Sequence, residues 1–320
     1  GWVIKYLIEY FAGHSKTLAG DAYFTTFISN GWSTEICFII FTLFTLGIIY
    51  AGVRNGIERV SKFMMPILIV LSLIIAVYSV TRPGAIEGVK YFLVPNFDHF
   101  SWMTVVSAMG QMFYSLSIAM GILITFGSYM KKDTSIEKST ENVEIFDTAI
   151  AIMAGLMIIP AVFAFSGGNA ETLKSGPALM FITIPKVFAN MGFGTAIGVV
   201  FFLLVLFAAV TSSIALTESA VSTFEDELHW SRKKSTVFMG MVMLLLGTLS
   251  CLGYGPLANF KILGMQFLDF FDFITNSVMM PIAAIATCLL VSRVIGVEKI
   301  EEEVTQGGKP FKRKRVFNMM

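Results

Sequence analysis

The sequence predicts an all-α membrane protein, a polytopic bundle of transmembrane helices, and three observations lead to this fold class. Only 14% of the 320 residues are charged, whereas soluble domains carry about 25%. Hydrophobic residues make up 55% of the chain, and a soluble core would leave much of this apolar surface in contact with water. The apolar residues also come in runs of about 20, the length that one helix needs to cross a bilayer.

Windows of about 19 residues place about seven full spans along the chain. The spans cover residues 33–52, 62–81, 102–130, 143–166, 194–223, 235–252 and 267–293. Residues 1–12 are apolar but too short to span, and they lack the basic start of a signal peptide. We therefore expect residues 1–320 to be a single truncated transmembrane domain, a fragment cut at both ends.

Basic residues are distributed unevenly between the two alternating sets of loops. One set carries Arg54, Arg59, Lys62, Lys131, Lys132, Lys138, Arg232, Lys233, Lys234 and the basic tail from Arg293 to Arg315. The other set carries Lys16, Arg82, Lys90, Lys174, Lys186 and Lys261. The positive-inside rule therefore predicts that the protein lies in the cell membrane with its richer loops in the cytoplasm, at 53–61, 131–142, 224–234 and 294–320.

Two outer loops carry their own patterns. Residues 82–100 contain two prolines and a glycine near their ends, and we expect a turn-rich cap there. Residues 167–193 contain the apolar run 181–185. This run is either a short helix that dips back toward a pathway through the bundle or one apolar turn of a surface loop.

The span at 102–130 is unusual because its middle is polar. Three glycines (Gly110, Gly121 and Gly127) are spread along it, and residues 111–117 read QMFYSLS at the depth of the bilayer centre. A helix broken there would offer carbonyls to a cation and amides to a carboxylate. Small residues that let helices pack closely explain the same pattern, and the residues alone leave both explanations open.

A second group of oxygen atoms lies on the span at 194–223. Ala208, Thr211, Ser212 and Ala215 recur at i, i+3, i+4 and i+7, so they share one helical face. Hydroxyl and carbonyl oxygens are the ligands of hard cations such as Na⁺. The alternative is close packing, with the hydroxyls bonded to carbonyls of the preceding turn.

Two carboxylates fall inside predicted spans. Asp147 lies near the start of the span at 143–166, where a charge costs about 2.5–3.5 kcal/mol and usually faces a cavity or a partner. A bound cation would offset that cost, and the alternative is an interfacial aspartate favoured by the dipole at a helix start. Glu218 lies in the span at 194–223, where it could pair across the bundle, and we assign it no further role.

Other classes of function have little support. A net charge of +1 provides no basic groove for nucleic acid. His14, His99 and His229 all lie in predicted loops, which leaves no intramembrane histidine for catalysis or zinc binding. The chain has neither a phosphate-binding glycine loop nor a nucleophile elbow. We therefore do not expect an enzyme.

Five stretches taken together resemble the bacterial neurotransmitter:sodium symporters, the family of the leucine-transporter fold. They read GQMFYSLS, AGLMIIPAVFAF, FAAVTSSIA, FEDELHWSRKK and LDFFDFITN, in the family's order and at its spacing over essentially the whole chain. The N-terminal GWVIKYLIEYF resembles the second half of the family's third helix, so the spans resemble helices four to ten. The resemblance implies alternating-access symport, with sodium ions as coupling ion and with an amino acid and the lipid bilayer as partners.

The resemblance also implies site residues. Ser115 and Asp147 match the first sodium site, and the Ala208 carbonyl, Thr211 and Ser212 match the second. The matching substrate-binding residues are Tyr114, Ser115, Ser117, Met120, Gly121, Ser212 and Leu216, and the matching gate residues are Gln111, Tyr129, Asp226 and Asp272. Asp147 stands where many members have asparagine, and its carboxylate would replace a chloride ion, so we expect chloride independence. A flexible Met120 beside Gly121 favours large hydrophobic or aromatic L-amino acids.

Rival functions give different expectations. A proton-coupled transporter of the same fold would carry a lysine in place of the sodium-site hydroxyls, and here Thr211 and Ser212 stand there. An intramembrane enzyme would need paired catalytic groups at mid-depth. A non-transporting membrane subunit would bind no ligand in a sodium-dependent way.

Overall fold

A computed structural model describes residues 1–98, 100–169, 176–306 and 311–315, and these are almost entirely helical. The chain divides into two compact units, residues 1–99 with 150–270 and residues 100–149 with 271–320. The loop position predicted for His99, the basic residue Lys174 and parts of the predicted loops 167–193 and 294–320 lie outside the described residues.

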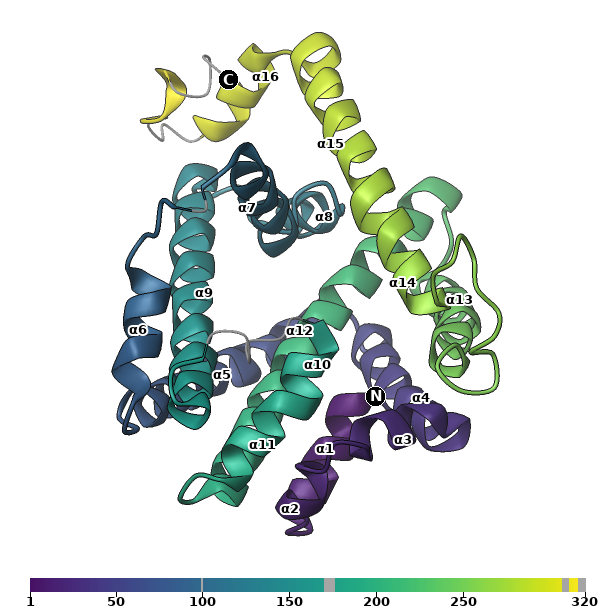
Figure 1. Cartoon of the computed structure of the whole chain (residues 1–320). Helices are drawn as coiled ribbons and strands as arrows, with labels where there is room; N and C mark the ends of the chain where they lie inside the picture. Colours follow the sequence, from purple (N-terminus) through teal and green to yellow (C-terminus); the bar gives the residue numbers. More distant parts are fainter. Residues whose placement is uncertain (99, 170–175, 307–310, 316–320) are drawn as a thin grey trace. The chain divides into compact units, whose positions relative to one another are not determined.

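Each unit is built from helices of two separate segments of the chain, which Figure 1 labels in chain order. The first unit contains α1 (Trp2–Phe11), α2 (Ser15–Leu18), α3 (Tyr23–Ser29), α4 (Gly31–Tyr50), the π-helical η1 (Val53–Glu58), α5 (Arg59–Val80), α6 (Ala85–Leu93), α10 (Gly176–Ala178), the π-helical η3 (Leu179–Thr183), α11 (Ile184–Ala189), α12 (Gly194–Leu228) and α13 (Arg232–Leu252). The second unit contains α7 (Trp102–Ser115), α8 (Ile122–Ser128), the π-helical η4 (Phe273–Met279), α15 (Met280–Leu289), the π-helical η5 (Leu290–Ile295) and α16 (Val297–Val304). Both α9 (Ile136–Ser166) and α14 (Phe267–Asp272) run from one unit into the other.

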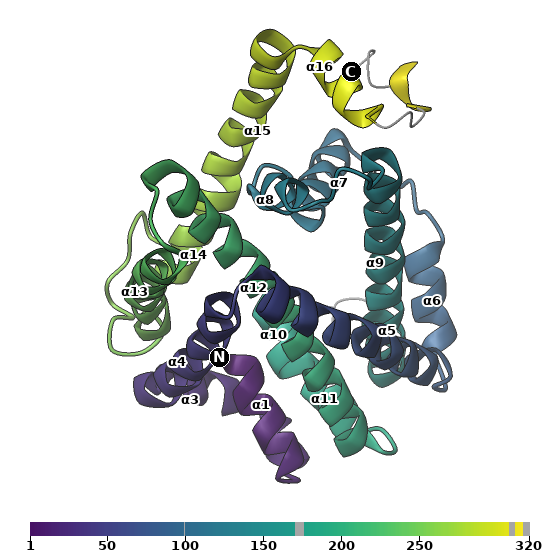
Figure 2. The same cartoon turned by 180° about the vertical axis from the view of Figure 1, so that it is seen from behind.

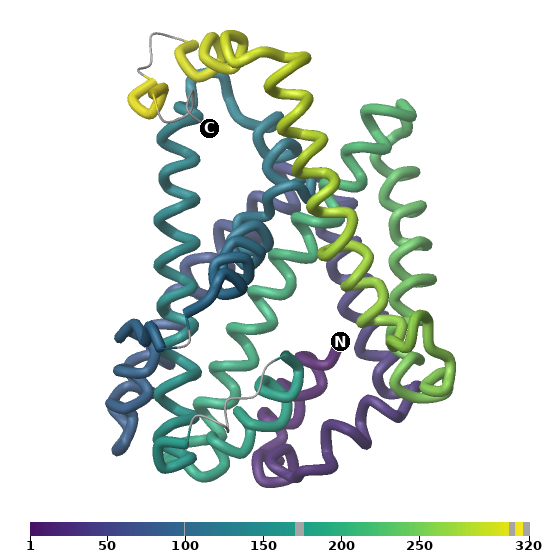
Figure 3. Tube along the Cα trace, turned by 45° about the horizontal axis from the view of Figure 1, so that its top comes forward, coloured from purple at the N-terminus to yellow at the C-terminus, as the bar shows by residue number. Residues whose placement is uncertain are grey.

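Six helical stretches in the described part of the chain are long and apolar enough to cross a membrane. They are Gly31–Tyr50, Val53–Val80, Ile136–Ser166, Gly194–Leu228, Arg232–Leu252 and Phe267–Ile295. Each coincides with a predicted span, and Figure 3 shows the last one as a continuous yellow-green rod. The remaining predicted span, 102–130, is divided into α7 and α8, so the expectation of a discontinuous helix in that region is confirmed.

Helix α12 forms the centre of the first unit and packs on α1, α4, α5, α11 and α13. Seen from behind in Figure 2, α4 and α13 lie side by side, and they too are packed together. Glycine allows α1 to come close to α12, because a Cβ at Gly198 would lie 2.1 Å from Cε1 of Tyr10. Phe202 is fully buried one turn further along α12 and stacks on Tyr10 with ring centroids 5.4 Å apart.

The apolar run 181–185 is helical and buried. It belongs to η3 and α11, and only 6% of Phe181 and 1% of Ile184 is exposed. Phe181 stacks on Phe24 at 5.2 Å, and its carbonyl accepts a hydrogen bond of 2.8 Å from the Tyr6 hydroxyl. The run is therefore helical, as one of the two interpretations expects, and its burial contradicts the alternative of an apolar turn on a surface loop.

Several predicted loops are shorter than expected because helices continue into polar sequence. The predicted loop 53–61 is wrong, since η1 and the start of α5 occupy it. The turn-rich cap predicted at 82–100 contains α6. This helix begins directly after Gly84, and Gly84 itself has a left-handed backbone conformation with φ 81°. The loops 131–142, 224–234 and 294–320 are likewise shortened by α9, α12, α13 and α16. Hydropathy finds the apolar part of a helix, whereas backbone hydrogen bonds carry the helix on through charged residues.

Candidate functional site

The interruption between α7 and α8 lies at residues 116–121. Helix α7 begins with a capping box of Ser101 and Thr104 and ends at Ser115. Ser117 (φ 55°) and Ala119 (φ 63°) then adopt left-handed conformations, as does Gly121 at φ 76° before α8 begins. Such conformations cost residues with a Cβ about 1–2 kcal/mol each. The backbone N–H groups of Leu116 and Ile118 still donate to carbonyls in the last turn of α7, those of Met112 and Phe113, at 3.0 and 2.9 Å, so the chain closes that helix end before it turns into α8.

Ser115 and Asp147 are brought together within the second unit. The Ser115 hydroxyl donates a hydrogen bond of 2.6 Å to Oδ1 of Asp147 across 32 residues of sequence. Helix α9 begins at Ile136, about three turns before Asp147. The alternative of a helix-start aspartate is therefore wrong, because the dipole effect is confined to the first turn. Carboxylate and hydroxyl oxygens meet here, and hard cations prefer such ligands.

The other predicted substrate residues of this region lie on or beside the interruption. Tyr114 is in the last turn of α7 and 54% exposed. Ser117 donates its N–H to the Tyr114 carbonyl at 3.1 Å, which closes the end of α7. Met120 and Gly121 follow on the same turn and are half-buried. Four of the predicted substrate residues thus lie on or beside the interruption, as Ser115 does.

The predicted second ion site lies on α12 in the first unit. The Thr211 hydroxyl donates to the carbonyls of Phe207 at 3.1 Å and Ala208 at 3.0 Å. These are the local hydrogen bonds that the close-packing alternative predicts. They use the hydroxyl proton and leave oxygen lone pairs on Thr211 and Ala208 that can accept or ligate. Ser212 is exposed on the next position of the helix.

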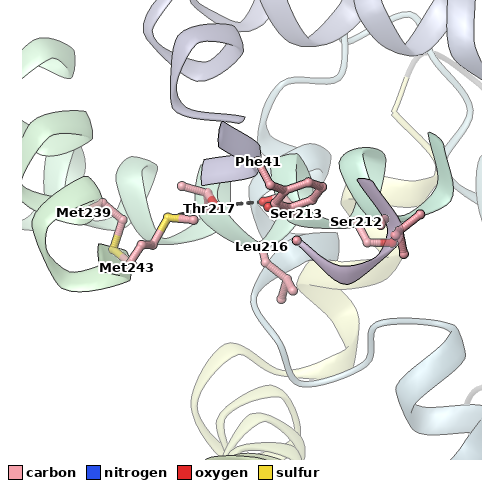
Figure 4. A pocket seen from close by; sticks show the side chains of 10 residues that line it. Phe41, Ser212, Ser213, Leu216, Thr217, Met239 and Met243 are labelled. Carbon is pink, nitrogen blue, oxygen red and sulfur yellow. Dashed lines mark hydrogen bonds between the residues drawn. The ribbon is translucent and has the colours of Figure 1, made fainter. Parts of the chain in front are cut away.

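Ser212 and Leu216 line a cavity of about 490 Å³ (Figure 4). The cavity is bounded by α1, α4, α12 and α13, and its other lining residues are Gly1, Val3, Phe41, Ala209, Ser213, Thr217, Met239 and Met243. Ala208 and Thr211 do not line it. Its wall is largely aliphatic, aromatic and thioether, with hydroxyls on one side, so it suits an apolar group that carries a polar end.

The predicted gate residues occupy three different helices and a helix end. Gln111 is exposed on α7, and Tyr129 caps the end of α8, with its ring 6.1 Å from that of Phe126. Asp226 is exposed near the end of α12. Asp272 ends α14 and accepts a hydrogen bond of 2.7 Å from the Asn276 amide.

Sequence reasoning missed the partner of Glu218. Glu218 is completely buried, and Arg232 donates to its two oxygens at 3.0 and 2.6 Å. Arg232 also donates to the Ile49 carbonyl at 2.9 Å and to Glu225 at 3.3 Å. Arg232 was assigned to a loop, although it is the first residue of α13. A signal for this pair was present in the sequence, because a carboxylate inside a span needs a cation and Arg232 is the first arginine that follows Glu218.

Comparison with known proteins gives consistent results over nearly the whole chain. The sequence model of the sodium:neurotransmitter symporter family matches residues 4–317. The uncharacterized sodium-dependent transporter YhdH of Bacillus subtilis is 33% identical over 317 residues, which cover 97% of this chain and 69% of the relative. An uncharacterized sodium-dependent transporter of Haemophilus influenzae is 30% identical, with coverage of 94% and 67%.

A solved structure has a similar fold. It is the crystal structure of MhsT in complex with L-phenylalanine, which shares 32% sequence identity with this chain. The superposition has a TM-score of 0.85 and covers 99% of this chain and 72% of the other. This similarity extends over both compact units.

Proposed function

The chain belongs to the sodium:neurotransmitter symporter family, whose members are transporters and not enzymes, and from this premise we propose that it serves Na⁺-coupled uptake of large hydrophobic or aromatic L-amino acids by alternating access. Its fold is that of the leucine transporters, as the similarity to MhsT establishes. The hydrogen bond between Ser115 and Asp147 at the interrupted helix carries the proposal, because it joins two hard oxygen ligands beside a break in a membrane-spanning helix.

We assign the first sodium site to Ser115 and Asp147. A cation there would draw on the second Asp147 oxygen and on a lone pair of the Ser115 hydroxyl. It would also offset the cost of a carboxylate within a span. The second site is assigned to the Ala208 carbonyl and the hydroxyls of Thr211 and Ser212. A neutral carbonyl–hydroxyl set suits a monovalent ion better than a divalent one, because divalent ions in proteins are held mainly by carboxylates.

The residues assigned to the substrate come from the irregular turn in the second unit and from α12 in the first unit. Backbone groups of the interruption are suited to the charged ends of a zwitterion, and the flexible Met120 and the exposed Leu216 to its apolar side chain. The remaining assigned residues are Tyr114, Ser115, Ser117, Gly121 and Ser212. Support for an aromatic substrate comes from MhsT, whose structure contains L-phenylalanine.

Coupling to two sodium ions supplies ample driving force. Two positive charges that move inward with a neutral zwitterion release about 4.6 kcal/mol per 100 mV of membrane potential. At about 1.4 kcal/mol per tenfold, this energy supports on the order of a thousandfold accumulation before any sodium gradient is added. Ion and substrate stabilise the same conformation, so each raises the affinity for the other.

Three further features complete the proposal. Asp147 supplies the negative charge that a chloride ion would otherwise provide, so transport is chloride-independent. Gln111, Tyr129, Asp226 and Asp272 act at the gates. The protein lies in the cell membrane, with the basic connections between α4 and α5, α8 and α9, α12 and α13, and the segment after η5, on the cytoplasmic side.

Sodium-dependent binding of radiolabelled L-phenylalanine by the intact protein tests the proposed function. Binding should rise with Na⁺ concentration and fall to background when choline replaces Na⁺. Unlabelled leucine and tryptophan should compete, whereas glutamate and lysine should not. Binding that is indifferent to Na⁺, or that only charged amino acids displace, would overturn the assignment.

A further inference from the structure

A basic segment at residues 311–315 is bound to the first turns of α9. Three glutamates, Glu137, Glu141 and Glu144, recur there at i, i+4 and i+7, so they share one helical face. We call this set the acidic face of α9. Like charges at this spacing destabilise a helix unless a cation neutralises them.

The contacts between the basic segment and the acidic face are specific. The two carboxylate oxygens of Glu137 accept the successive backbone N–H groups of Lys312 and Arg313, at 3.1 and 2.9 Å. The Arg313 guanidinium then donates to Glu144 at 2.9 Å and lies 3.6 Å from Glu141. One arginine and its own backbone thus engage all three carboxylates of the acidic face.

The basic segment is also held from its other side. Lys314 forms an ion pair of 2.5 Å with Glu301 on α16. Helix α16 follows directly on the last apolar helical stretch, with Gly296 in a left-handed conformation at φ 84° between them. The basic segment therefore ties α16 to the start of α9, and all of these residues belong to the second unit.

The acidic face is close to the proposed first sodium site along the same helix. Glu144 precedes Asp147 by three residues, about 4.5 Å along the helix axis. Helix α9 is continuous between them, so a displacement of its first turns moves Asp147 relative to Ser115. Arg313 is exposed on about half its surface, so its ion pairs are of the weak, salt-sensitive kind.

We propose that Arg313 is a positioning residue for sodium binding: by holding the acidic face of α9, it fixes Asp147 in the arrangement that meets Ser115. This inference rests on the proposed function. Arg313 itself contributes no ligand to the ion. Its effect is to favour the conformation that binds sodium, and so to lower the sodium concentration that uptake requires.

The test measures Na⁺-dependent phenylalanine uptake by the intact protein in vesicles. Arg313→Ala should raise the Na⁺ concentration for half-maximal uptake about two- to fivefold, as expected for weak exposed ion pairs. Uptake at saturating Na⁺ should stay close to that of the unaltered protein. The matched control is Arg315→Ala, which removes the same charge two residues away, at a side chain with no carboxylate partner among the described residues.

Two further measurements separate positioning from loss of structure. Exchanging the charges, with Arg313→Glu and Glu144→Arg together, should restore most of the Na⁺ affinity that Arg313→Glu alone removes. Added choline gluconate should raise the half-maximal Na⁺ concentration of the unaltered protein and leave that of Arg313→Ala nearly unchanged, because salt screens only the intact pairs.

The outcomes are distinguishable. If the unaltered protein shows no Na⁺-dependent uptake, the proposed function fails whatever Arg313 does. If uptake is present but Arg313→Ala behaves like Arg315→Ala, or the charge exchange restores nothing, the positioning role fails alone.

Discussion

Glu218 and Arg232 form a bidentate ion pair in which the carboxylate is completely buried. Arg232, at the start of α13, thereby connects α13 with α12 and α4 in the first unit. The guanidinium reaches Glu218 at 2.6 and 3.0 Å, and its Nε donates to the Ile49 carbonyl at the end of α4. Breaking a buried pair by removing one partner is strongly destabilising, because the remaining charge has no compensation. The junction of α4, α12 and α13 therefore depends on this contact.

Arg232→Ala should lower the free energy of unfolding by about 3–5 kcal/mol, because the Glu218 carboxylate would remain buried without its cationic partner. Thermal unfolding of the purified protein in detergent measures the effect. Glu227→Gln, at an exposed position on α12, the helix that carries Glu218, is the control and should change little. The double replacement Glu218→Leu with Arg232→Met should recover most of the loss. A single variant as stable as the control would show that the pair is unimportant.

Gly198→Ala should destabilise the packing of α1 on α12. The new Cβ would lie 2.1 Å from the Tyr10 ring, which is itself buried and has little room to move. Overpacking of this kind costs about 1–3 kcal/mol. Gly47→Ala is the matched control, because a Cβ there meets nothing within 4 Å and alanine favours a helix. The unfolding midpoint should fall for the first variant and hold or rise for the second.

Ser212→Ala should weaken sodium dependence. Loss of one oxygen ligand to the charged ion should weaken the free energy of Na⁺ binding by about 1.5–3 kcal/mol. The half-saturating Na⁺ concentration should therefore rise roughly tenfold or more. Ser213→Ala is the adjacent control, because its hydroxyl contacts Thr45 at 3.2 Å and is not an assigned ligand. Equal sodium dependence in both variants would remove Ser212 from the second site.

Replacement of chloride by gluconate should leave transport unchanged, because Asp147 already supplies the negative charge. Asp147→Asn should make the residual transport depend on chloride. Initial rates of phenylalanine uptake in matched chloride and gluconate buffers provide the comparison. A collapse of uptake by the unaltered protein in gluconate would refute chloride independence.

Much of the fold was predictable from the sequence, for a clear physical reason. A span needs about 20 apolar residues, so hydropathy locates α4, α12 and α13 well. It fails at helix ends, where charged residues such as those of η1 continue the helix beyond the apolar window. Ser117 and Ala119 adopt left-handed conformations that residues with a Cβ disfavour, so only the general region of the break was foreseeable from the sequence.

The candidate site was predictable to a lesser extent. Polar groups stand out in an apolar span, which is why Ser115, Asp147 and Thr211 could be proposed as site residues from the sequence. Their contacts were not all foreseeable. The partner of Glu218 was missed because its arginine was assigned to a loop, and the acidic face of α9 gives no indication in sequence of the distant basic segment that binds it.

The central claim is that Ser115 and Asp147 hold a sodium ion, and a sodium titration of phenylalanine binding tests it most directly. Titrations should compare the unaltered protein with Asp147→Ala, Ser115→Ala and the control Asp133→Asn, which alters a carboxylate in the connection between α8 and α9. We predict that Asp147→Ala raises the half-saturating Na⁺ concentration about thirtyfold or more and Ser115→Ala less. The control should match the unaltered protein. Identical titrations for Asp147→Ala and the control would contradict the account.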